Sequence, residues 1–150
     1  MQFGHIAVGL AISTYDWNLG TIAVVNGAHW LPNADVFLIK AGMAKDSFHC
    51  WITHTLLFAL AVSLLILPFS TKYALFALIS LVAHYLADLP SDIGQQLLWP
   101  LSKRKFTLAL WKDTGFWGWE TIKGGYAQWT TWVVEGAAFA FLIYRLTVIY

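Results

Sequence analysis

The sequence predicts an all-α fold, a polytopic membrane helical bundle that forms a single integral membrane domain over residues 1–150. Of its residues 59% are hydrophobic and only 11% are charged, whereas soluble domains average about 45–50% apolar and about 25% charged residues. Three apolar stretches are also long enough to cross a bilayer core, which takes about 20 helical residues. The formal net charge of +1 gives no reason to expect nucleic acid as a partner.

The N-terminal third differs from the later stretches. Its two apolar segments, FGHIAVGLAISTY and GTIAVVNGAHWLP, are separated by the polar turn DWNLG. A helix rises about 1.5 Å per residue, so each segment spans only about 20 Å and is too short to cross a membrane alone. We therefore expect a short N-terminal helical hairpin that enters the membrane and returns, sheltered by other helices. One broken spanning helix is the alternative.

Three spanning helices are predicted after this hairpin, over Trp51–Phe69, Thr71–Leu89 and Trp129–Tyr150. The first two are separated by so few residues that they must form a tight antiparallel pair. Between the second and third spans lies a polar segment, residues 90–128, that is rich in tryptophan and in basic residues. This composition is typical of the headgroup region, so we expect an interfacial segment with Trp111, Trp117 and Trp119 at headgroup depth.

Basic residues are distributed unequally about the three predicted spans. Lys72 and Arg145 fall on or near one side of the membrane. All the others fall on the opposite side, namely Lys40, Lys45, Lys103, Arg104, Lys105, Lys112 and Lys123. Because loops rich in lysine and arginine stay in the cytoplasm, this second side is predicted to be cytoplasmic.

A histidine and an aspartate stand at the end of the second predicted span. His84 and Asp88 are four residues apart and therefore share one face of a helix. Such a pair can bind one metal ion, or the carboxylate can orient the imidazole. The alternative is a buried hydrogen-bonded pair that stabilises the helix end. Ionisable groups are rare in membrane helices without such a role.

Other ligand-type residues fall on the same side of the membrane. His54 begins the neighbouring span at a depth that matches His84. His49 can face the same centre only from a frayed helix start, because five residues correspond to about 140° around a helix. Asp35 lies in a loop on that side, and a helical hairpin returns His5 to it. Imidazole and carboxylate ligands together suit zinc or another divalent ion. His29, next to Trp30, is expected at the membrane interface instead.

The motifs LPNAD, HCWITHT and HYLADLPSDIGQQLLWPLSKRKF, preceded by an N-terminal histidine, resemble the YdjM-type family of inner-membrane metal-dependent hydrolases. The family patterns run roughly LPDxD, HRGxTHS and HxxxDxxTxxGxxLLxP, and the match extends from His5 to about Phe106. A more distant similarity to zinc-dependent phospholipase C and zinc-dependent nucleases implies phosphoester hydrolysis. The resemblance implies an inner-membrane location and a set of metal ligands, namely His5, Asp35, His49, His54, His84 and Asp88.

The chain departs from the first two family patterns at four positions. Asn33, Cys50, Trp51 and Thr55 stand where the patterns have aspartate, arginine, glycine and serine. Without the carboxylate a hard oxygen ligand is lost, and without the arginine a bidentate phosphate clamp is lost. Most ligand-type residues therefore survive while substrate-type residues change. This combination suits a divergent enzyme and also suits a pseudoenzyme that is kept as a structural subunit.

Two functions therefore remain open. The first is a membrane-bound hydrolase in which a divalent ion, zinc by preference, activates water against a lipid-linked phosphoester. In it the metal ligands are His5, His54, His84 and Asp88, the catalytic residues are Asp35 and His49, and the substrate-binding residues are Lys103, Arg104 and Lys105. The second is a non-catalytic subunit whose aromatic surface packs against other membrane protein subunits. In both, membrane lipid is a partner.

Overall fold

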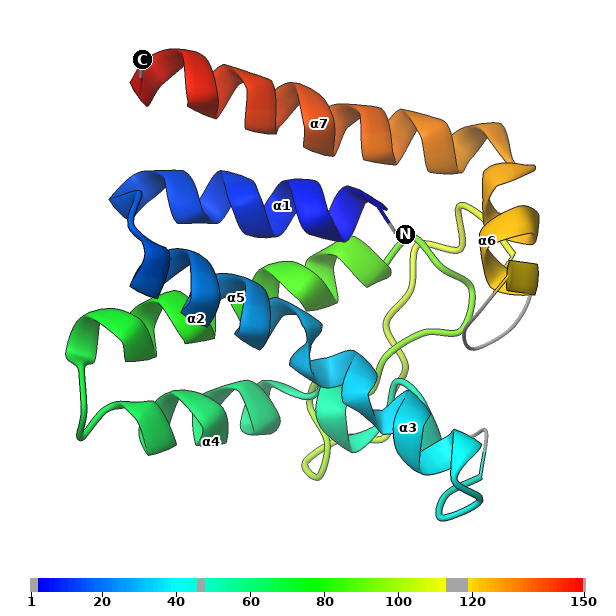
Figure 1. Cartoon of the computed structure of the whole chain (residues 1–150). Helices are drawn as coiled ribbons and strands as arrows, with labels where there is room; N and C mark the ends of the chain where they lie inside the picture. Colours follow the sequence, from blue (N-terminus) through cyan, green and yellow to red (C-terminus); the bar gives the residue numbers. More distant parts are fainter. Residues whose placement is uncertain (1–2, 46–47, 113–118, 150) are drawn as a thin grey trace.

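The computed structural model describes residues 3–45, 48–112 and 119–149, which fold into a helical bundle with no β-strand among them. The longer helices stack on one another in Figure 1, and the short helices α3 (Asp35–Lys40) and α6 (Trp119–Tyr126) project from one end. The longer helices are α1 (Phe3–Ser13), α2 (Leu19–Trp30), α4 (Leu56–Ile66), α5 (Thr71–Asp88) and α7 (Trp129–Ile149). The predicted all-α fold class is confirmed.

The predicted N-terminal hairpin is present as α1 and α2. A 3₁₀ turn over Thr14–Asp16 ends α1, and the side chain of Asn18 caps α2 by accepting the Thr21 N–H at 3.0 Å. The two helices approach closely at Gly9, where an added Cβ would lie only 2.6 Å from Asn26 Oδ1. Helix α1 also packs against α5 and α7, so other helices shelter the hairpin as expected.

Helices α4 and α5 form the predicted antiparallel pair, but α4 is shorter than its apolar sequence indicates. The hydroxyl of Thr55 caps α4 by accepting the Phe58 N–H at 3.0 Å. The residues before it form a 3₁₀ turn over Ile52–His54. The prediction of a helix from Trp51 was therefore wrong at its start, and α4 has only 11 residues.

Helix α5 is the centre of the bundle and packs against α1, α2 and α4. Its Ala77 and Leu81 meet Ala28 of α2 and Ala59 of α4 in a buried core, which Tyr85 closes at the site end. Small side chains at such crossings let helix backbones approach closely, which is how membrane helices gain packing energy.

Helix α7 packs along α1, and hydrogen bonds connect it to the N-terminal hairpin at two places. The Tyr126 hydroxyl donates to the Glu135 carboxylate at 2.6 Å and accepts the Phe3 N–H at 3.1 Å. At the other end Arg145 Nε donates to Thr14 Oγ1 at 3.0 Å. Within the described residues α7 is the one helix both long and apolar enough to cross a bilayer alone, so three spanning helices stay a prediction.

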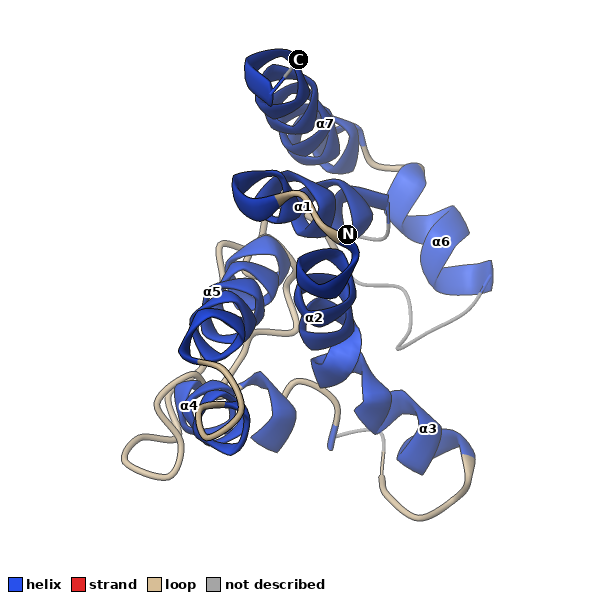
Figure 2. Cartoon of the chain, turned by 60° about the vertical axis from the view of Figure 1, so that its left-hand side comes forward, coloured by secondary structure: helices blue, strands red, loops and turns tan. Residues whose placement is uncertain are grey.

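The segment after α5 consists of loops and turns (Figure 2), and it folds back onto the start of α4, where the Leu56 N–H donates to the Leu97 carbonyl oxygen at 2.9 Å. Two isolated bridges, Gln95 with Phe106 and Ser91 with Trp111, hold this loop together. Trp111 is only 5% exposed and Trp119 is 65% exposed. The protein therefore surrounds most of the Trp111 ring, and the headgroup depth of Trp111 and Trp119 stays a prediction. Trp117 lies outside the described residues.

Candidate functional site

The candidate site lies at the end of the bundle where α1 begins and α2 and α5 end. It gathers side chains from five separate segments, and all but Asp88 are at most 2% exposed. Asp88 is 17% exposed at its side chain. The α1–α2 hairpin and the antiparallel α4–α5 pair bring these segments, which are distant in the sequence, to the same end of the bundle. The cluster comprises His5, His29, Asp35, His54, His84 and Asp88.

Two histidines converge on Asp88. Its Oδ2 atom lies 3.1 Å from His84 Nε2 and 3.7 Å from His54 Nε2. The first distance follows from the four-residue spacing along α5, and the second from the antiparallel packing of α4 against α5. The ligand-type atoms of this group all lie within 4.8 Å of one another. The structure thus brings together the three residues that the sequence placed at one end of the antiparallel pair.

Thr53 determines which nitrogen of His54 carries the proton. Its hydroxyl has one hydrogen, which it donates to Asp35 Oδ2 at 3.0 Å. Its oxygen, 3.0 Å from His54 Nδ1, must therefore accept the Nδ1–H of His54. A neutral imidazole has one N–H, so the other nitrogen, Nε2, presents a lone pair towards Asp88. Sequence analysis missed Thr53, and its position directly before His54 was the one available signal.

His49 faces the same carboxylate although it is five residues from His54. Its Nδ1 donates to Asp35 Oδ1 at 2.9 Å, and the two rings are 5.5 Å apart. Regular helix geometry would turn them away from each other, but Cys50 has a φ of 61° and breaks the regular helix. Asp35 therefore holds His49 directly and holds His54 through Thr53.

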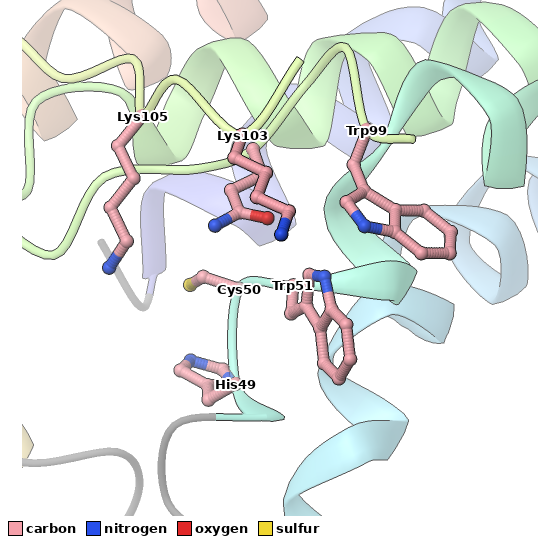
Figure 3. Close-up of a pocket in the computed structure, with 7 residues that line it drawn as sticks. His49, Cys50, Trp51, Trp99, Lys103 and Lys105 are labelled. Atoms are coloured by element: carbon pink, nitrogen blue, oxygen red, sulfur yellow. The ribbon is translucent and has the colours of Figure 1, made fainter. Parts of the chain in front are cut away.

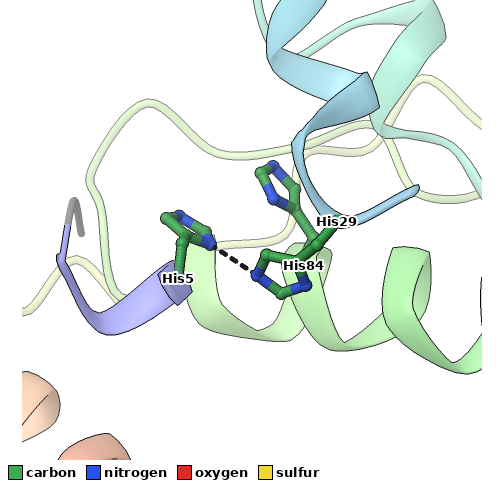
Figure 4. Close-up of side chains that lie close together, drawn as sticks. All are labelled: His5, His29 and His84. Carbon is green, nitrogen blue, oxygen red and sulfur yellow. Dashed lines mark hydrogen bonds between the residues drawn. The ribbon is translucent and has the colours of Figure 1, made fainter. Parts of the chain in front are cut away.

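His29 is part of the cluster, contrary to the expectation that it lies at the membrane interface. Its side chain is fully buried, and its Nε2 lies 3.0 Å from His5 Nδ1 (Figure 4). Nε2 of His5 in turn lies 2.8 Å from Asp88 Oδ1. The prediction for His29 was wrong because the turn of the hairpin brings the C-terminal end of α2 beside the start of α1. The predicted approach of His5 is confirmed.

Buried nitrogen atoms without hydrogen bonds mark the centre of the cluster. His54 Nε2 and both ring nitrogens of His84 are buried and make no hydrogen bond within the described part of the chain. Buried polar atoms are nearly always paired, so each exception requires an explanation. Ligand atoms at about 2.0–2.1 Å from a tetrahedral zinc ion lie about 3.3 Å apart. The distances of 3.1 and 3.7 Å bracket this value, so these buried groups could hold a metal ion.

A polar pocket of about 240 Å³ opens beside the cluster (Figure 3). Lys103 and Lys105, both predicted to bind substrate, line it together with His49. Arg104 does not line it, and its guanidinium lies 5.6 Å from the ring centroid of Phe106. His49 thus belongs both to the pocket and to the Asp35 pair. The remaining lining residues are Cys50, Trp51, Gln96 and Trp99.

The YdjM inner membrane protein family matches residues 1–150 of the chain. The protein belongs to this family. The resemblance seen in the motifs is confirmed over the whole chain, and the protein is of an inner-membrane family. Neither the curated proteins nor the solved structures contain a match.

None of the departures from the YdjM patterns named above falls in the cluster, and two of them fall in the pocket. Cys50 and Trp51 line the pocket. Thr55 caps α4 with its hydroxyl, as the serine of the pattern also would. Asn33 borders a separate apolar hollow beside Val36. The ligand-type groups of the cluster are therefore intact, while part of the pocket lining differs from the family pattern.

Proposed function

We propose that this YdjM-family protein is a membrane-bound metal-dependent hydrolase that acts on a lipid-linked phosphoester. The observation that carries the proposal is the convergence of His54 Nε2, His84 Nε2 and Asp88 Oδ2, in which neither imidazole nitrogen makes a hydrogen bond. A buried polar group left without a partner costs about 1–3 kcal/mol. A coordinated cation would give both nitrogens a partner, which would explain why the fold buries them without hydrogen bonds.

The cluster supplies a ligand set typical of zinc. His54, His84 and Asp88 hold the ion, because two imidazoles and one carboxylate leave a fourth position open in a catalytic zinc site. A divalent ion bound there supplies Lewis-acid polarisation of a phosphoryl oxygen and a nucleophile at neutral pH. His5, the fourth predicted ligand, lies against Asp88.

The pocket supplies the groups that bind the substrate and move a proton. Lys103 and Lys105 offer ammonium groups to a phosphate, which lysine binds as a point charge. His49 exchanges a proton with the reacting group, and Asp35 orients its ring through Nδ1. Cys50 leaves more room in the pocket than the arginine of the family pattern. The two lysines take the place of that arginine as the source of positive charge.

A lipid-linked substrate is supported by the surroundings of the pocket. The loop that carries Trp99 exposes Leu98 (43%) and Leu101 (94%). Exposed leucines beside a polar pocket suit a membrane surface, where an acyl chain stays in the bilayer while its phosphate enters the pocket. Arg104, outside the pocket, meets anionic headgroups. The basic end of the bundle, which contains the site, is proposed to face the cytoplasm of a multi-pass inner-membrane protein.

Metal content and hydrolysis test this proposal together. The purified wild-type protein is expected to hold a stoichiometric divalent metal by elemental analysis and to hydrolyse bis(4-nitrophenyl) phosphate. His84→Ala is expected to lose both while keeping its helical circular dichroism. Ser63→Ala is the matched control, because Ser63 is also buried but bonds to Ala74 in the other half of the α4–α5 pair. A wild-type protein that binds no divalent metal would refute the proposal.

A non-catalytic subunit is the second candidate. It is favoured by α7, whose buried residues are the polar Thr131 and Glu135, so that its apolar side chains stay available to lipid or to other membrane protein subunits. The loss of the family's arginine and glycine at Cys50 and Trp51 also favours it. Absence of metal, together with co-purification of other membrane subunits in stoichiometric amounts, would select this second function.

A further inference from the structure

His29 has no counterpart in the motifs that carry the family resemblance, yet it is fully buried in the site. Its Nδ1 lies 3.1 Å from the backbone carbonyl oxygen of Ser80 in α5. A carbonyl oxygen only accepts, so Nδ1 of His29 carries the hydrogen. Nε2 of a neutral His29 is then an acceptor, and it is directed at His5 Nδ1.

The hydrogen-bonded chain continues from His29 to the carboxylate. His5 donates its Nδ1–H to His29 and its Nε2–H to Asp88 Oδ1, at 2.8 Å. In this arrangement His5 carries both ring hydrogens and offers no lone pair to an ion, so it orients Asp88 rather than binding the metal itself. An ionised carboxylate accepts only, so His5 must be the donor in this contact. One oxygen of Asp88 is thereby held by His5, while the other, Oδ2, faces His54 and His84.

His84 is held by packing from the same two rings. Its own ring nitrogens make no hydrogen bond. The His5 ring stacks on it with centroids 4.4 Å apart and planes 23° from parallel. The edge of His29 meets it at 5.1 Å and 76°. These ring contacts and the Asp88 Oδ2 atom, 3.1 Å from His84 Nε2, together fix the direction of the His84 imidazole.

We propose that His29 is a positioning residue of the metal site, and that it acts through His5 on Asp88 and His84. This inference rests on the proposed function. Anchored to Ser80, His29 fixes the ring of His5, and His5 fixes the carboxylate oxygen that does not face the ion. Partners that orient ligands in this way affect metal affinity by about 10–100-fold when they are removed.

Titration of the metal-free full-length protein with Co²⁺ in detergent tests the inference, because the visible absorption of Co²⁺ reports coordination geometry as well as affinity. His29→Leu fills the space but cannot accept from His5. It is expected to bind Co²⁺ about 10–100-fold more weakly, with an altered visible spectrum. His29→Gln places an amide oxygen towards His5 and is expected to stay closer to wild type. Val25→Ala is the control for lost packing, because Val25 is also fully buried on α2, one turn earlier.

The outcomes separate this inference from the proposed function. Weaker binding and an altered spectrum in His29→Leu, with both retained in His29→Gln and Val25→Ala, support it. If wild type binds Co²⁺ and His29→Leu binds equally well with the same spectrum, the positioning role is wrong and the proposed function stands. Equal losses in His29→Leu and Val25→Ala would reduce His29 to a packing residue. A wild-type protein that binds neither Co²⁺ nor Zn²⁺ overturns both.

Discussion

Replacement of Thr53 by valine removes one hydroxyl from the site and leaves its shape almost unchanged. That hydroxyl donates to Asp35 at 3.0 Å and accepts from His54 Nδ1 at 3.0 Å. In Thr53→Val the buried Nδ1–H of His54 has no acceptor, which costs about 1–3 kcal/mol. The imidazole can avoid this cost by moving its proton to Nε2, where Asp88 Oδ2 lies 3.7 Å away. That proton then occupies the lone pair that a metal ion requires.

Both responses to Thr53→Val weaken metal binding. We expect Zn²⁺ affinity, measured by competition with a fluorescent chelator, to fall by about 10–100-fold, the usual effect of removing a group that orients a ligand. The metal-free variant should lose at most about 1–3 kcal/mol of unfolding free energy. Thr53→Ser keeps the hydroxyl and should bind like wild type. Equal Zn²⁺ affinities for the valine and serine variants would show that Thr53 does not set the state of His54.

Three further predictions concern the pocket, the far end of the bundle and the orientation. Lys103→Ala should raise the KM for a phosphodiester about tenfold or more, since a hydrogen bond to a charged group contributes about 1.5–3 kcal/mol. Arg104 lies outside the pocket, so Arg104→Ala should leave KM unchanged. Equal effects of the two substitutions on KM would argue that the pocket does not bind the substrate. The hydrogen bond from Lys72 lowers the pKa of Asp16 from 3.8 to about 2, so Asp16 stabilises the folded state above pH 3.8 and loses this contribution as the pH falls towards 2. Between these values Tm should therefore fall more steeply in wild type than in Asp16→Asn, and parallel curves would contradict this. A cysteine at Ser70, in a background without the native cysteine, should react with impermeant reagents in intact cells, whereas reaction only after permeabilisation would reverse the proposed orientation.

The helical elements were largely predictable from the sequence. Apolar length and the polar turns between apolar stretches predicted the α1–α2 hairpin, the α4–α5 pair and α7, because backbone groups in an apolar environment must be satisfied within helices. The start of α4 was missed. Thr53, His54 and Thr55 follow Trp51 without a break in hydropathy, so nothing in the sequence marked a later start. The hydrogen bonds of Thr53 to Asp35 and of Thr55 to the backbone are what make α4 begin at Leu56.

Most residues of the candidate site could also be predicted from the sequence. The spacing of His84 and Asp88 predicted a shared face, because helix geometry is local. The antiparallel pair predicted the approach of His54, and the hairpin predicted the return of His5. These inferences needed only the lengths of helices and of the turns between them.

The tertiary structure alone decided which polar atoms meet. His29 looked like an interfacial residue because it stands next to Trp30, and Trp111 was expected at headgroup depth because its segment is rich in tryptophan and basic residues. Both are buried by segments distant in the sequence. The sequence by itself determined a helical membrane protein with histidines and carboxylates at one end. The hydrogen-bond directions at His54 and His5, and hence the lone pairs left for an ion, depend on packing between helices, which no local pattern encodes.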